Sequence, residues 1–207
     1  WASPRNFNSA FEDFYGPPPG AGGPSGSLGY TIGFLNAGTV TATTGLATAR
    51  GLMQLATSTA TNGAAIMRTA TAPFIFGGGR MTLLMRVRIP TLSDGTDTFS
   101  FMAGFGDKTT AGDIQDGAYF TYSSQADYYT NVANWSGKTA NNNTRTEVPG
   151  AAVAGNTFYT IQVDVNAAGT QVDFYVDGVS IGNSTTNIPT GAGREFGIEC
   201  KLEKVVG

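Results

Sequence analysis

The chain contains no histidine among its 207 residues. This absence removes the Ser-His-Asp and Cys-His nucleophilic mechanisms, and it also removes the commonest zinc ligand. Cysteine is almost absent as well, because Cys200 is the single one and no internal disulfide can form. We therefore interpret Cys200 as a small buried hydrophobic residue, and we expect stability to come from packing.

Charge is also scarce, with 13% charged residues, a net charge of -3 and a pI of about 4.8. No basic stripe could neutralise phosphates, so we expect no nucleic-acid partner. No run approaches the roughly 20 apolar residues of a spanning helix, so we expect no membrane insertion. What the chain does have is 41% hydrophobic residues and 29 glycines. This composition favours β-structure, and the length suits one large all-β domain or two small ones.

The N-terminal part differs from the rest in composition. Residues 16–29, "GPPPGAGGPSGSLG", predict a linker or extended arm. The segment before them carries aromatic residues spaced for one face of a short helix: Phe7, Phe11, Phe14 and Tyr15. We interpret this segment as a docking element, either for a partner or for its own domain. The predicted organisation is an arm over 1–29 and a β-sandwich over 30–207. Since the chain begins with Trp1 and stops within a plausible strand, we expect it to be a portion of a longer polypeptide, truncated at its C-terminus.

Short apolar clusters recur every ten residues or so in the first third of the chain. They lie at 30–35, 52–55 and 64–67, among frequent Thr and Gly, and they predict short strands joined by turns. Residues 81–89 alternate, with apolar side chains at odd positions and Leu84 as the exception, and Pro90 ends the predicted strand. Residues 99–105 repeat the pattern.

The stretch 159–181 predicts a three-stranded meander. An Asp177-Gly178 type I′ turn would place Val176 opposite Val179 and Phe174 opposite Ile181. A four-residue loop at 166–169 would place Val165 opposite Thr170 and Ile161 opposite Phe174. A slip of one residue would move the apolar set to the wrong face of the sheet.

The C-terminal segment "REFGIECKLEKV" also alternates. Phe196, Ile198, Cys200 and Leu202 are predicted inward, and Glu195, Glu199, Lys201 and Glu203 outward on a solvated face. The fold class that follows is all-β, a two-layer antiparallel β-sandwich with one solvated face per sheet.

The run "FYTIQVDVNAAGTQVDFYVDGVSIG", residues 158–182, resembles the hairpin pair of concanavalin A-like (laminin-G-like) jelly-roll domains. "MTLLMRVRIPTLSDGTDTFSFMAGFGD" and "TTNIPTGAGREFGIECKLEKVVG" resemble the versions found in bacteriophage virion proteins, and the similarity covers about residues 75–207. The resemblance implies a non-enzymatic structural or display protein of the virion, in the capsid, a head fibre or the tail. It would be anchored through its N-terminal arm to other virion proteins and repeated as a homo-oligomer.

Glucanases of this superfamily carry an E-x-D-x-x-E carboxylate set, which this chain lacks. Glu195, Glu199 and Glu203 are spaced by four, about 13 Å between neighbours at 3.3 Å per residue, too far apart for that chemistry. We interpret Asp94, Asp97, Asp113 and Asp116 as turn residues rather than calcium ligands. The sequence therefore predicts no enzyme activity, no metal and no cofactor.

The alternative function is a carbohydrate-binding, lectin-like adhesin. Its candidate glycan-binding residues are Tyr128, Tyr129, Asn134 and Trp135, because aromatic rings stack on sugars and amides bond their hydroxyls. The competing interpretation is that the aromatic residues of this region fill the core and that its Asn-rich part forms a hairpin tip.

Overall fold

The computed structural model describes residues 30–35, 38–42, 53–57, 63–69, 72, 74–94, 98–108, 110–123 and 133–206. Every regular element within these ranges is a β-strand. The strands are β1 (Tyr30–Leu35), β2 (Thr39–Ala42), β3 (Met53–Ala56), β4 (Ala64–Thr69), β5 (Met81–Arg88), β6 (Thr98–Gly106), β7 (Gly117–Ser123), β8 (Asn134–Asn141), β9 (Thr144–Ala152), β10 (Phe158–Val165), β11 (Val172–Val176), β12 (Val179–Ser184) and β13 (Gly197–Val206).

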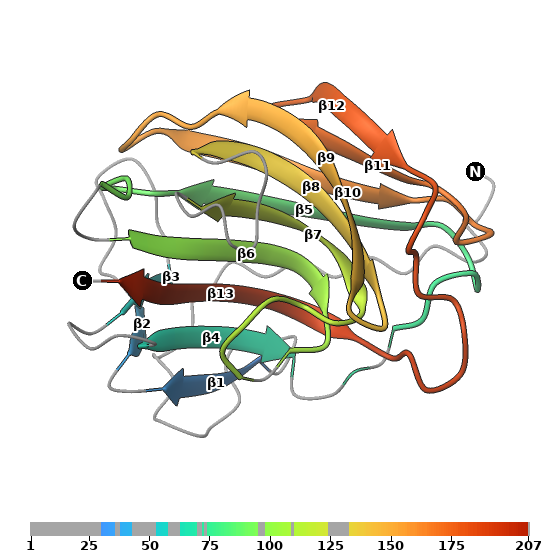
Figure 1. Cartoon of the computed structure of the whole chain (residues 1–207), viewed down its shortest axis with the longest axis horizontal. Coiled ribbons are helices and arrows are strands. Elements are labelled where there is room, and N and C mark those ends of the chain that lie inside the picture. Colours follow the sequence, from blue (N-terminus) through green and yellow to red (C-terminus); the bar gives the residue numbers. More distant parts are fainter. Residues whose placement is uncertain are drawn as a thin grey trace, which may run out of the picture.

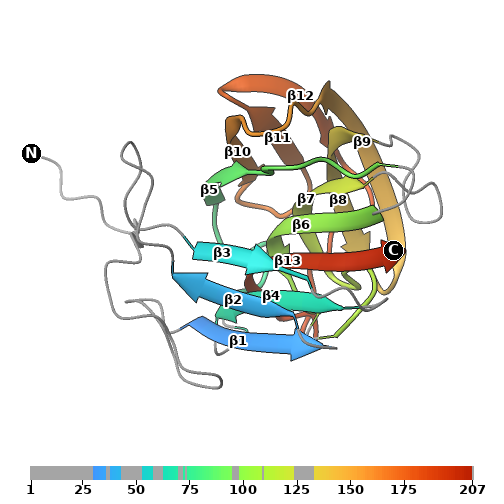
Figure 2. The ribbon, with the colours of Figure 1, turned by 90° about the vertical axis from the view of Figure 1, so that its left-hand side faces the viewer.

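Two antiparallel sheets form the sandwich, as the sequence predicts (Figure 1). The larger sheet has seven strands in the order β1-β4-β13-β6-β7-β8-β9, and the smaller has four in the order β12-β11-β10-β5. β2 and β3 form a separate hairpin, which lies beside β4 in the turned view (Figure 2). In both sheets, strands distant in sequence lie next to each other, with β13 between β4 and β6 and β5 beside β10.

The core between the sheets is rich in aromatic rings. Phe105 on β6 and Phe196, directly before β13, pack edge to face at 5.7 Å between ring centroids. Trp135 is 0% exposed and contacts Phe101 and Tyr122 from the same sheet. Cys200 is buried in this cluster as predicted, and burial raises the pKa of its thiol to about 12.

The alternation of the predicted strands is confirmed. From 81 to 87, β5 carries its partly buried side chains at odd positions, and Leu84 is 61% exposed on the other face; Arg88, at the end of the strand, is also partly buried. Phe196, directly before β13, and Ile198, Cys200 and Leu202 on β13 belong to the core or pack against it. The strands predicted within 30–67 are also present as β1, β3 and β4, whereas the alternating pattern gave no signal for β2.

The meander β10-β11-β12 is confirmed with one turn as predicted. Asp177 and Gly178 both have positive φ, 50° and 77°, as a type I′ turn requires, and Val176 pairs with Val179. Beyond this pair the prediction fails, because Phe174 lies opposite Gly182 rather than Ile181. The register shifts there through a β-bulge. Gly182 fits this site because its φ is 133° and a Cβ would lie 2.8 Å from Val148 Cγ1.

The predicted register of the preceding hairpin is wrong by two residues. Val165 pairs with Val172, not Thr170, and Ile161 pairs with Val176, not Phe174. The side chain of Asn166 explains the difference, since its Oδ1 accepts the amide of Thr170 at 2.8 Å and closes a longer loop. A shift of two preserves parity, so the apolar side chains still face the core.

Candidate functional site: a polar cluster beneath the β6–β7 loop

The outer face of the seven-stranded sheet contradicts the sequence prediction. Glu199 and Lys201 are 0% exposed and Glu203 is 9% exposed, although they were predicted on a solvated face; Glu195, before the strand, is exposed. The reason is the connection between β6 and β7, which folds back over this face and contacts it. Gly106 makes room for this packing, because a Cβ there would lie 2.6 Å from Glu199 Cδ and 2.8 Å from Ile114 Cδ1.

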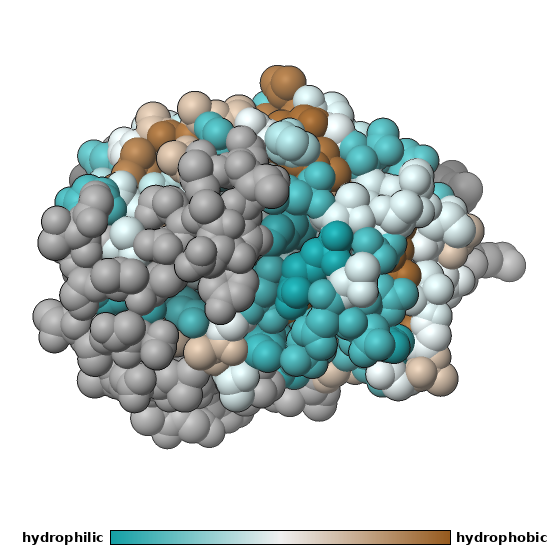
Figure 3. Space-filling model, in the orientation of Figure 1, coloured by the Kyte–Doolittle hydropathy of each residue, from teal (hydrophilic) through white to brown (hydrophobic). Residues whose placement is uncertain are grey.

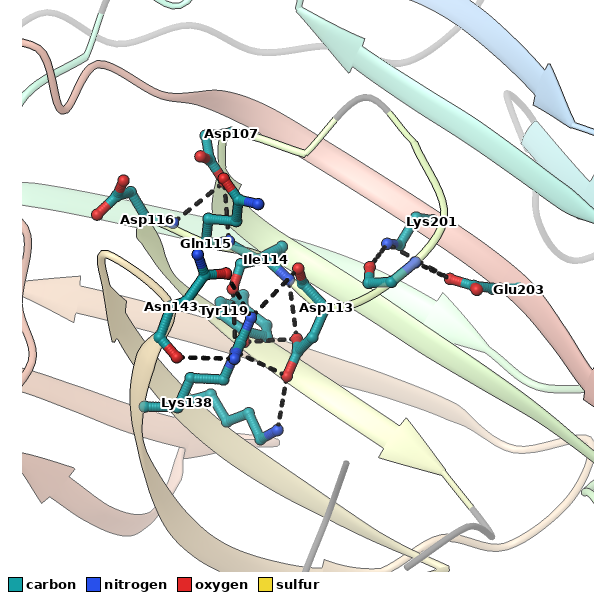
Figure 4. Close-up of polar contacts among 12 residues, drawn as sticks. Asp107, Asp113, Ile114, Gln115, Asp116, Tyr119, Lys138, Asn143, Lys201 and Glu203 are labelled. Atoms are coloured by element: carbon teal, nitrogen blue, oxygen red, sulfur yellow. Dashed lines mark hydrogen bonds and ion pairs between the residues drawn. The ribbon is translucent and has the colours of Figure 1, made fainter. Parts of the chain in front are cut away.

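Asp113 is the centre of the cluster (Figure 4). Its carboxylate accepts the hydroxyl of Tyr119 at 2.7 Å, the ammonium of Lys138 at 3.0 Å and the amide of Ile114 at 2.9 Å. Arg145 Nε lies 3.0 Å from Asp113 Oδ2 and donates to the carbonyl of Ile114 at 3.1 Å. Burial lowers the pKa of Lys138, and the charge and hydrogen bond of Asp113 oppose that shift. Three strands, β7, β8 and β9, thus hold one loop carboxylate.

The sheet register brings these partners together. Lys138 on β8 pairs with Tyr119 on β7, which pairs with Gly104 on β6, which pairs with Glu199 on β13. Residues that pair directly across antiparallel strands point to the same face. The polar side chains of this row therefore lie side by side beneath the loop.

A second set of contacts joins the loop to the turn between β8 and β9. Asp107 Oδ1 accepts the amides of Gln115 at 3.0 Å and Asp116 at 3.1 Å. Asp116 accepts the amide of Asn142 at 2.8 Å and pairs with Arg194 at 2.9 Å. The Asn142-Asn143 turn has positive φ at both residues and forms the hairpin tip that the sequence suggested.

Glu203 and Lys201 hold the other end of the loop. Glu203 Oε2 accepts the amide of Gly112 at 2.9 Å. Lys201 Nζ donates to the carbonyls of Gly112 and, at 3.4 Å, Thr110, and it lies 3.6 Å from Glu203 Oε2. Burial lowers the pKa of Lys201, while Glu203 and Glu199 oppose the shift.

Glu199 differs from the other carboxylates of the cluster because no hydrogen bond from a described residue stabilises its buried oxygens. Neither of its carboxylate oxygens has a hydrogen-bond partner among the residues that the structure describes. Burial raises the pKa of Glu199 to about 7, and the charges of Lys201 and Arg68 moderate the rise. The backbone amide of Lys108 lowers this pKa less than these charges do, because its geometry does not allow a regular hydrogen bond to the carboxylate.

This arrangement fixes the backbone of the loop and presents polar groups around it. Figure 3 shows a largely hydrophilic surface in the middle of this face, where the β6–β7 loop of Figure 1 crosses. Asn142, Asn143 and Thr144 are exposed at the adjoining hairpin tip, and Gln115 is half-buried. Within the described ranges, no group of three or more His, Cys, Asp or Glu residues could hold a metal ion. Nor do these ranges contain a helix long and apolar enough to cross a membrane.

The residues predicted from the sequence are distributed differently. Trp135 and Tyr122 lie in the core between the sheets and offer no face to a sugar, as the core interpretation expects. Tyr119 is also buried, but on the outer face of the seven-stranded sheet beneath the β6–β7 loop. Asn134 begins β8 and is half-buried. Tyr128 and Tyr129, and the docking residues Phe7, Phe11, Phe14 and Tyr15, lie outside the described residues, so these assignments stay predictions.

Sequence reasoning missed the cluster itself. Asp113 and Asp116 lie in a loop, as predicted for turn residues, but both also form ion pairs. The one signal in the sequence is Lys138, a charged residue within the strand segment "NWSGKTAN" between small side chains. Nothing in the local pattern connects it to Asp113, which is 25 residues away.

Comparisons with known proteins agree with this architecture. The chain resembles the crystal structure of SO2946 from Shewanella oneidensis MR-1, a protein of unknown function, at 14% identity and a TM-score of 0.62 over 86% of this chain and 71% of that one. It resembles an endo-1,3-beta-glucanase from Streptomyces sioyaensis at 13% identity and a TM-score of 0.57, over 100% and 88% of the two chains. The potassium-bound carbohydrate recognition domain of Emp46p gives 9% identity and a TM-score of 0.55, over 86% and 82%.

These neighbours show the fold class of the chain, a jelly-roll β-sandwich of the concanavalin A-like type. Within this class, residues 48–207 match the SO2946-like, C-terminal domain family, and the chain belongs to that family. No curated protein sequence matches it.

Proposed function

We propose that this domain is a non-catalytic carbohydrate-binding module, which recognises a saccharide at the polar surface formed by the β6–β7 loop and the β8–β9 turn. The observation that carries the proposal is the fixed loop: Asp113 and Asp116 hold it to three strands and to the neighbouring turn. A rigid backbone that presents amide and hydroxyl groups suits the recognition of sugar hydroxyls at little cost in ordering entropy.

The fold neighbours support the same class of ligand. Among those with TM-scores above 0.5, one is a carbohydrate recognition domain and another an endo-1,3-beta-glucanase. The narrower role as a phage virion component finds no support in these comparisons, so the virion location, the virion partners and the homo-oligomer stay predictions.

The non-catalytic part of the proposal rests on the carboxylates of this face. Glycoside hydrolysis uses two carboxyl groups about 5–10 Å apart on either side of the substrate. Asp113 is held by Lys138 and Arg145, and Glu203 by the Gly112 amide. Glu199 has the raised pKa of a general acid, but it is 0% exposed beneath the loop. Asp113 and Glu203 therefore hold the loop in place, and the loop covers Glu199, so we infer that none of the three acts on a bound sugar.

A glycan array followed by calorimetric titration tests the proposal. Two variants remove side chains at the polar surface: Gln115→Ala, and Asn143→Gly, which retains the positive φ of the turn. We expect each to weaken binding about tenfold while the melting temperature changes little. Arg86→Ala, on the outer face of the four-stranded sheet, is the matched control and should bind normally. The proposal is wrong if no glycan binds, or if β-1,3-glucan is hydrolysed and Glu199→Gln abolishes the activity.

A further inference from the structure

The ammonium group of Lys201 lies in surroundings made of oxygen atoms. It donates to the carbonyls of Gly112 and Thr110, and a carboxylate oxygen of Glu203 lies 3.6 Å away. Glu199 acts on the same ammonium through its charge. Figure 4 shows Lys201 and Glu203 directed toward the same stretch of the loop. Backbone carbonyls and carboxylates are the ligands that hard cations take in proteins.

The site is buried, and a neighbouring carboxylate on β13 has no hydrogen-bond partner among the described residues. The side chain of Lys201 is 0% exposed and that of Glu203 is 11% exposed. Glu199, two residues before Lys201 on the same face of β13, is also 0% exposed, and neither of its oxygens has a hydrogen-bond partner among the described residues. The ionised form of such a buried carboxyl group needs a positive charge nearby. Lys201 supplies that charge from within the chain.

We propose that the space between β13 and the β6–β7 loop is a hard-cation site that Lys201 fills with its own ammonium group. The loop is thereby held on the sheet without a metal ion. Shortening Lys201 leaves the carbonyls of residues 110 and 112 and a carboxylate oxygen of Glu203 around an empty space. A free cation with oxygen ligands, K⁺ or Ca²⁺, then takes the place of the ammonium. This inference is independent of which ligand the domain recognises.

Melting temperatures of three variants, measured in choline chloride buffer with added KCl or CaCl₂, test the inference. Lys201→Ala opens the space, and its melting temperature should fall and then rise with the logarithm of the cation concentration, as linkage to a bound ion requires. Lys201→Met fills the same space with an uncharged side chain and should not respond. Lys138→Ala removes another buried lysine, which donates to the carboxylate of Asp113, and should not respond either.

The two salts identify the ion. A response to K⁺ and Ca²⁺ at similar concentrations indicates a site that does not discriminate between the two ions by charge, as expected if the backbone carbonyls supply most of the ligands. A response to Ca²⁺ at much lower concentration indicates that carboxylate charge contributes to the binding. The natural protein should keep its melting temperature in a chelator. The inference is overturned if Lys201→Ala responds to neither cation, or if the chelator lowers the melting temperature of the natural protein. If Lys201→Ala does not fold in choline buffer, its refolding yield with each salt becomes the measurement, and no recovery with either salt overturns the inference as well.

Discussion

Lys138 on β8 donates to the carboxylate of Asp113 in the β6–β7 loop at 3.0 Å, and both side chains are almost completely buried, at 2% and 3% exposure. This pair joins residues 25 positions apart and lies on the outer face of a sheet, where solvent would ordinarily reach. Two buried charges that depend on each other make the loop an integral part of the folded domain rather than a loose connection.

Replacing Asp113 should therefore be costly. Asp113→Asn leaves the Lys138 ammonium buried without its carboxylate, and we expect the free energy of unfolding to fall by about 3–5 kcal/mol. Urea denaturation provides the measurement. The double variant Asp113→Asn with Lys138→Met should recover part of the loss, because no uncompensated ammonium remains. A loss below about 1 kcal/mol in the single variant would show that the pair contributes no more than a surface ion pair.

The stability of the domain should depend on pH through Glu199. Its pKa in the folded state, about 7, lies above the ordinary value of 4.5, so the folded protein retains a proton that the unfolded chain has already lost between these pH values. Stability then falls as pH rises from about 4.5 to about 7, by at most about 3 kcal/mol at 1.36 kcal/mol per pKa unit.

Glu199→Gln should flatten this slope and should be more stable than the natural protein at pH 8. Urea midpoints at several pH values measure the effect. The exposed Glu195→Gln serves as the control and should keep the natural slope. If the urea midpoint fell with pH equally in the natural protein and in Glu199→Gln, the raised pKa of Glu199 would be wrong.

Gly137 marks a close contact between the two sheets. A Cβ at this position would lie 2.3 Å from Cγ of Phe174 on the facing sheet. Gly137→Ala forces a ring in the core to move, and we expect a loss of about 1–3 kcal/mol. Gly191→Ala, where nothing lies within 4 Å of the added Cβ, is the control and should change stability by less than about 0.5 kcal/mol.

Trp135 should matter for stability and not for a ligand. Its ring is fully buried among Phe101, Phe120, Tyr122 and Tyr159, so Trp135→Ala should cost about 3–5 kcal/mol. Trp135→Phe retains much of the packing and should bind any glycan as the natural protein does. If the Trp135→Phe protein kept the natural melting temperature but bound no glycan, Trp135 would be a binding residue and this prediction would be wrong.

The periodicity of the sequence determined which side chains face the core. The alternation along 81–89 and 196–202 is local, and a strand that buries one face must place its apolar residues there. The Asp177-Gly178 turn is also a local feature, because Asp-Gly is one of the few residue pairs that readily adopt positive φ at two consecutive positions.

Only the tertiary structure decided what happens on the opposite face. An alternating pattern states that Glu199 and Lys201 point away from the core, but it does not state whether another segment covers them. The β6–β7 loop covers them, and its contacts with Lys201 and Glu203 join residues 89 and 91 positions apart, which leave no local periodicity. For the same reason the register at Asn166 could be predicted only to within an even shift. Because one face is buried, the pattern excludes registers that are shifted by an odd number of residues. The hydrogen bond from the Thr170 amide to the Asn166 side chain then selects one of the registers that remain.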